Sequence, residues 1–124
     1  MPVLRRPAEP THELPGALFT SLATPSSGSL DVAVWEVRLT PGHPATPHRL
    51  THHEVFVATA GRAIATLDGR THEVVAGDCL VVPPDTDLTL EPADAEGFTA
   101  LCLLPAGGKA VIGDGEPFTP PWAV

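Results

Sequence analysis

Four histidines and a glutamate lie close together in one segment of the chain, residues 41–61. His43, His48, His52 and His53 fall within eleven residues, and Glu54 follows them directly. Neutral imidazole nitrogens and carboxylate oxygens are the ligands that first-row transition metals take from proteins. The segment therefore predicts either a metal site or an acid–base pair at the start of an apolar strand.

The elements that would position these residues are short β-strands. Alternating apolar residues predict strands at 19–23, 30–39, 54–60, 62–67, 70–75, 79–82, 88–90 and 98–104. Asp68-Gly69 predicts a type I′ hairpin turn, and no window has a convincing helical pattern. About eight evenly spaced strands, with fifteen Pro and eleven Gly, indicate an all-β sandwich or closed barrel.

The size of the chain indicates one domain, since 124 residues suffice for a single hydrophobic core. We expect an N-terminal arm at 1–16, a barrel at 17–105 and an extended C-terminal tail at 106–124. In the tail, Phe118 and Trp122 are expected to dock on the barrel or on a partner subunit, the barrel being the simpler option.

The charge of the chain limits its partners. Seven Lys and Arg against fifteen Asp and Glu give a formal net charge of −8, which disfavours nucleic acid. No apolar run reaches the length of a membrane span or a signal-peptide core, so we expect a cytoplasmic protein with no membrane partner. Cys79 and Cys102 both lie in apolar runs and are interpreted as buried free thiols.

The spacing of residues 42–61 resembles the first motif of the cupin family. That motif is Gly, five residues, His-x-His, three or four residues, Glu, six residues, Gly. Here Gly42, His48, Glu54 and Gly61 keep every spacing, and Leu50 replaces the second histidine. The resemblance implies a single jelly-roll barrel and a small-molecule ligand, and cupins often pair, so we expect a homodimer.

The second cupin motif is present only in part. It reads Gly, five residues, Pro-x-Gly, two residues, His, three residues, Asn. Gly77 and Pro83 match, whereas Asp85, Leu88 and Pro92 replace the glycine, the histidine and the asparagine. The resemblance extends over roughly residues 32–105.

The resemblance implies a metal held by the histidines and the glutamate of these motifs, and half of that set is missing. His48 and Glu54 remain, while Leu50 and Leu88 stand at the other two ligand positions. His52 shares the parity of His48 and Glu54 in an extended segment, so these three residues could form a facial triad for Fe, Mn, Ni or Zn.

Other interpretations of these residues stay open. His52 and His53 are interpreted alternatively as solvated loop residues. His48 and Glu54 are interpreted alternatively as a catalytic acid–base pair or as a structural hydrogen-bonded pair.

The expected ligand pocket has an apolar wall. Leu50, Leu88 and Phe56 would line the barrel interior, with Arg49 at its rim and Cys102 facing inward. The sequence therefore supports a small-molecule-binding barrel, acting as a metal-dependent oxygenase or an isomerase-type enzyme. The alternative is a metal-free binding or sensing module without catalysis.

Overall fold

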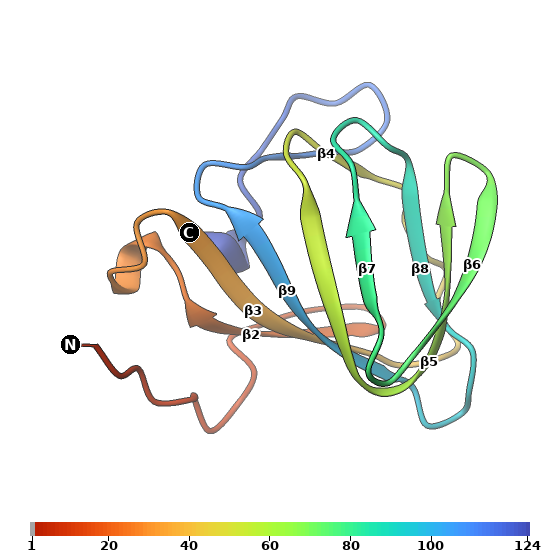
Figure 1. Ribbon diagram of the computed structural model, residues 1–124, viewed down its shortest axis with the longest axis horizontal. Coiled ribbons are helices and arrows are strands. Elements are labelled where there is room, and N and C mark those ends of the chain that lie inside the picture. The colour runs from red at the N-terminus through yellow and green to blue at the C-terminus, as the bar shows by residue number, and fades with distance from the viewer. Residues whose placement is uncertain (1) are drawn as a thin grey trace.

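Alternating apolar side chains form the strands of a curled all-β barrel in the computed structural model, which describes residues 2–124 (Figure 1). The strands are β1 (His12–Leu14), β2 (Ala17–Ala23), β3 (Val32–Leu39), β4 (Arg49–Leu50), β5 (Glu54–Leu67), β6 (Arg70–Val75), β7 (Cys79–Val82), β8 (Leu88–Pro92), β9 (Phe98–Pro105) and β10 (Ala110–Val111). Two short 3-10 turns complete the set, η1 (Pro25–Ser27) and η2 (Pro121–Ala123). No helix among residues 2–124 has the length and apolarity needed to cross a membrane. The predicted all-β jelly-roll fold is confirmed.

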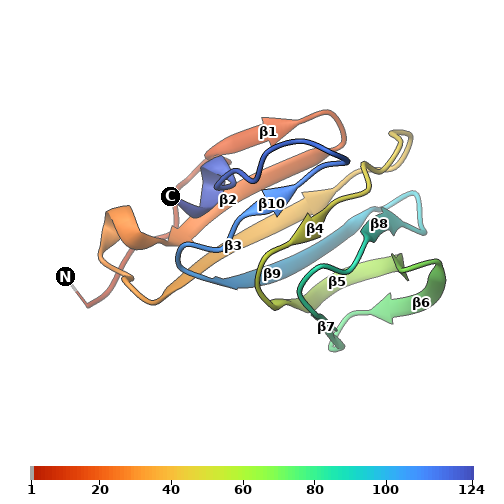
Figure 2. The ribbon, with the colours of Figure 1, turned by 90° about the horizontal axis from the view of Figure 1, so that it is seen from above.

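The strands pair antiparallel throughout the larger sheet, in the order β1-β2-β3-β9-β5-β6. Strands β7 and β8 also pair with β5, and β4 pairs separately with β10. Seen from above, β4 and β10 lie over the curled sheet (Figure 2). A pair of backbone hydrogen bonds between His48 and Leu88 connects the segment before β4 to β8.

Strand β5 is the element that joins the two halves of the barrel. Its first half pairs with β7 and β9, and its second half pairs with β6 and β8. The sequence predicted separate strands at 54–60 and 62–67, but the structure has one continuous strand. Gly61 lies at the change of partners with φ of +79° and allows the strand to pass without interruption.

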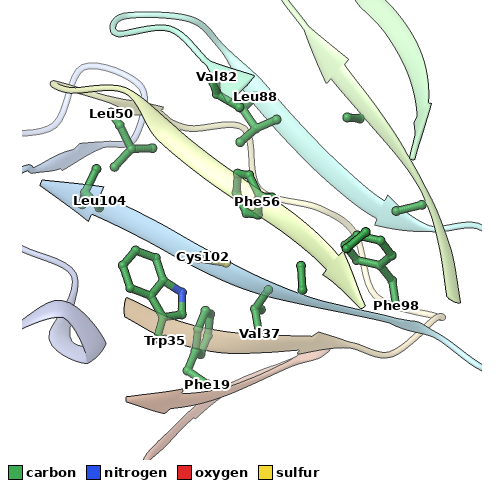
Figure 3. Close-up of a cluster of buried hydrophobic side chains, with 14 of the residues drawn as sticks. Phe19, Trp35, Val37, Leu50, Phe56, Val82, Leu88, Phe98, Cys102 and Leu104 are labelled. Carbon is green, nitrogen blue, oxygen red and sulfur yellow. The ribbon is translucent and has the colours of Figure 1, made fainter. Parts of the chain in front are cut away.

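The hydrophobic core lies between the two halves (Figure 3). One face of β3 is buried at Ala33, Trp35 and Val37. The facing strands contribute Phe56 from β5 and Leu88 from β8, each less than 10% exposed. Aliphatic and aromatic side chains from both halves therefore form the core together.

The C-terminal tail docks on the chain's own barrel. Trp122 stacks on Phe19 with ring centroids 3.6 Å apart, and Ser21 Oγ donates a hydrogen bond to the Trp122 carbonyl at 2.8 Å. Phe118 pairs with Ala110 through two backbone hydrogen bonds. The simpler of the two docking options predicted for the tail is therefore the observed one.

The two cysteines have different environments. Cys102 on β9 is buried, whereas Cys79 at the start of β7 is exposed. The prediction of two buried thiols is wrong for Cys79, because Leu80 and Val82 take the inward positions of this short strand.

Replacing Gly61 by alanine should destabilise the barrel strongly. A Cβ atom built on Gly61 would lie 2.1 Å from the Gly97 carbonyl oxygen, which is a backbone clash. Gly69 has a similar φ of +83° but open space around it, so Gly69→Ala is the matched control. We expect Gly61→Ala to lower the free energy of unfolding by about 2 kcal/mol more than Gly69→Ala does, measured by urea denaturation. Equal losses in the two variants would contradict the predicted steric cost at Gly61.

Candidate functional site

A cavity of about 640 Å³ opens into the barrel between strands β2, β3, β5, β8 and β9. Its wall is mainly apolar and includes Phe19, Trp35, Phe56 and Leu88. Phe56 and Leu88 lie across the barrel from Phe19 and Trp35 (Figure 3). Such a size and lining are typical of sites that bind small organic molecules.

Glu54 is the acidic residue that the fold buries in this cavity wall. It is the first residue of β5, where its backbone pairs with Val82 of β7. The side chain is only 4% exposed, and its Oε1 atom has no hydrogen-bond partner among the described residues. A buried carboxyl oxygen without a partner is costly, and in a ligand cavity it marks a place for a polar group of the ligand.

Burial raises the pKa of Glu54 to about 8 from its ordinary value of 4.5. The physical cause is the loss of hydration, which disfavours the charged carboxylate. Glu54 is therefore a neutral carboxylic acid at neutral pH. A strongly shifted group in a cavity is typical of functional sites.

His48 also lines the cavity, and its backbone pairs with that of Leu88, which stands at the position of the second-motif histidine. Its backbone exchanges two hydrogen bonds with Leu88, of 2.8 and 3.1 Å. Its Nδ1 atom lies 3.1 Å from the Thr46 carbonyl oxygen. Since a carbonyl oxygen only accepts, this contact places a proton on Nδ1.

Of the other residues predicted for the pocket, three line the cavity and two do not. Phe56, Leu88 and Cys102 line the cavity. Leu50 is buried in the core at 2% exposure but does not line the cavity. Arg49 does not reach the rim, because its guanidinium donates to the Gly113 carbonyl at 3.0 Å.

The Cys102 thiol is deeply buried, and its pKa lies well above the ordinary value. Burial is the main cause, and the nearby carboxyl of Glu54 adds to it. A thiol with a raised pKa is a poor nucleophile and a poor metal ligand. Cys102 therefore contributes shape to the cavity rather than reactivity.

The structure does not bring His52 to His48 and Glu54. Residues 51 and 52 form a bend, which breaks the strand alternation on which the predicted triad depended. His52 is exposed, its Nδ1 lies 2.8 Å from the Thr51 hydroxyl, and His53 is also exposed. Neither ring lines the cavity, so the solvated-loop interpretation describes both residues.

The residues present do not fit the metal that the motif positions imply. Leucine occupies two of the four ligand positions, at Leu50 and Leu88, and both side chains are 2% exposed or less. Across residues 2–124, no three His, Cys, Asp or Glu side chains are grouped closely enough to hold a metal ion. His48 and Glu54 alone leave fewer protein ligands than the three usual for catalytic zinc or non-haem iron.

Several residues that shape the cavity were not predicted as site residues. Trp35 on β3 and Trp122 in the tail both line the cavity, although they are far apart in the sequence. His43 lines it from the loop after β3. The alternation of β3 places Trp35 inward, which was the available signal for that residue. The aromatic residues of the tail predicted that Trp122 docks on the barrel, but not that it lines the cavity.

The chain matches one protein family model and is similar to several known proteins. A family model described as "Cupin domain" matches residues 35–103. A dimethylsulfoniopropionate lyase of Ruegeria pomeroyi, DddW, is 43% identical over 47 residues. That match covers 38% of this chain and only 31% of the lyase.

Solved structures share the fold at lower identity. KdgF from Halomonas sp. superimposes with a TM-score of 0.66 and 19% identity, over 78% of this chain and 86% of that one. Salicylate 1,2-dioxygenase of Pseudoaminobacter salicylatoxidans, solved with gentisate, gives 0.70 and 18%, over 86% and 32%. Oxalate decarboxylase of Bacillus subtilis, studied for its Mn(II) centers, gives 0.71 and 25%, over 84% and 29%.

The buried carboxyl should make folding stability fall as the pH rises from about 4.5 to about 8. Below this interval Glu54 is protonated in both states, and its contribution is fully present. Within the interval the unfolded state releases the proton and the folded state keeps it, so the free energy of unfolding falls by about 1.4 kcal/mol per pH unit. Above about 8 the loss is complete.

Glu54→Gln is the variant that isolates this effect, because it keeps the shape and removes the titration. We expect the difference in unfolding free energy between wild type and Glu54→Gln to decline with pH across the interval, measured by urea denaturation at a series of pH values. Parallel stability curves for the two proteins would show that burial does not shift Glu54.

Proposed function

The chain belongs to the cupin family, and on that basis we propose that it binds a small, largely apolar organic molecule in its barrel cavity without a resident metal. The observation that carries this proposal is the cavity itself, about 640 Å³ in volume, with the unpartnered carboxyl of Glu54 in an otherwise apolar wall. Few polar groups in an apolar cavity give orientation and specificity to a bound molecule.

The substituted ligand positions support binding without a metal. Leu88 replaces a motif histidine and lines the cavity, so a position that could hold a metal instead adds apolar surface. Leu50 fills the core beside it. Both substitutions remove a side chain that could bind a metal, and Leu88 also increases the apolar contact that a ligand would make.

A metal-dependent oxygenase or isomerase-type enzyme is the function that the named relatives suggest. The dioxygenase and decarboxylase above are much longer than this chain, and the lyase match is confined to 47 residues. Their chemistry would require a metal that His48 and Glu54 do not suffice to hold. We therefore place this function behind metal-free binding.

Metal-free acid–base catalysis is a second candidate, and the raised pKa of Glu54 favours it. A carboxyl group with a pKa of about 8 can give or take a proton near neutral pH. His48 lines the same cavity and offers a second proton-transfer group. This candidate differs from binding alone in requiring a turnover that depends on Glu54.

Filling the cavity should abolish ligand binding. Leu90 is half-buried on β8 and lines the cavity, so Leu90→Trp would occupy part of its volume. Both tryptophans of the chain, Trp35 and Trp122, also line the cavity, so their indole N–H signals report on its contents in NMR spectra. We expect benzyl alcohol to shift both signals in the wild type and to bind roughly tenfold more weakly, or not at all, to Leu90→Trp.

Val81→Trp is the matched control, because Val81 is 54% exposed on β7 and does not line the cavity. This variant should bind the probe like the wild type. Binding that persists in Leu90→Trp, or shifts that avoid both cavity tryptophans, would count against the proposed function.

A further inference from the structure

The ionisable side chains that line the barrel cavity include a carboxyl group but no arginine or lysine among the described residues. They are His43, His48, Glu54 and Cys102. The arginine nearest in sequence, Arg49, is turned to the Gly113 carbonyl outside it. A bound anion would therefore meet a carboxyl group and no permanent positive charge.

Two of the polar groups that line the cavity, the carboxyl of Glu54 and the ring of His48, can accept a hydrogen bond from a ligand. Glu54 Oε1 is buried and has no donor among the described residues. The Nδ1 atom of His48 lies 3.1 Å from the Thr46 carbonyl oxygen, so Nε2 is the ring nitrogen left to bond with a ligand. A ligand with hydrogen-bond donors of its own would satisfy these two acceptor atoms.

Aromatic rings form a large part of the remaining wall. Trp35 and Phe56 line the cavity from β3 and β5, and the stacked pair Phe19 and Trp122 lines it from β2 and the tail. Aromatic faces attract cations, and the attraction increases when the site excludes water. The formal charge of −8 on the whole chain acts in the same direction.

We propose that the ligand is an organic cation, a protonated amine on a small apolar body, with Glu54 as its counter-ion. This inference rests on the proposed function and specifies the ligand class of the same cavity. The ammonium group donates to Oε1 of Glu54, which is buried and has no other hydrogen-bond partner among the described residues. The apolar body contacts Leu88 and the aromatic wall.

Three probes of similar shape and different charge test the inference. Benzylammonium, benzyl alcohol and benzoate are titrated into the wild-type protein near neutral pH, with the indole signals of Trp35 and Trp122 as the readout. We expect benzylammonium to bind roughly tenfold or more tightly than either of the others, because a buried charge-assisted hydrogen bond exceeds a neutral one.

Two variants assign that preference to Glu54. Glu54→Gln should bring the affinity for benzylammonium down to that for benzyl alcohol, while retained binding of benzyl alcohol shows that the cavity is intact. Glu91→Gln makes the same charge change at an exposed position of β8 and should leave the preference unchanged. If Glu54→Gln does not fold, the comparison of the three probes on the wild type decides alone.

Each result has a definite meaning. Equal or tighter binding of benzyl alcohol or benzoate overturns the cation assignment and leaves the proposed function standing. An amine preference that survives in Glu54→Gln overturns the role of Glu54. If none of the probes binds the wild type, both the proposed function and this inference fail.

Discussion

The hydrogen bonding of strand β5 is the constraint on which the rest of the barrel depends. This strand pairs with β7 and β9 in its first half and with β6 and β8 in its second half. Its continuity through Gly61 curls the sheet and closes the interior. Because β5 begins at Glu54, the same pairing holds a carboxyl group at the wall of the cavity that the curl creates.

The burial of Glu54 connects the fold to its chemistry. In an apolar wall the carboxylate loses hydration, and the pKa rises to about 8 as a result. A metal or a basic side chain would offset that loss, but Leu50 and Leu88 stand at two of the positions where the family motif has metal ligands. The carboxyl group of Glu54 is therefore buried in a wall where Leu88 adds apolar surface in place of a motif histidine.

The sequence predicted the barrel better than the site. Strand alternation and the Asp68-Gly69 turn are local signals, and Asp68 and Gly69 have the positive φ values of a type I′ turn. The parity argument for His52 failed because a bend at residues 51–52 interrupts the extended backbone. The stacking of Trp122 on Phe19 joins residues about a hundred positions apart, and no periodicity in the sequence encodes such a contact.

The metal content of the protein is the most direct test of the claim that this cupin barrel has an apolar ligand cavity and no resident metal. Protein purified without a histidine tag is incubated with Fe, Mn, Ni or Zn, freed of excess ion and analysed by elemental analysis. The account predicts well under one equivalent of any metal in the wild type and a gain of bound metal in Leu50→His/Leu88→His, which restores both ligand positions. One equivalent of metal in the wild type that is lost in His48→Ala would contradict it.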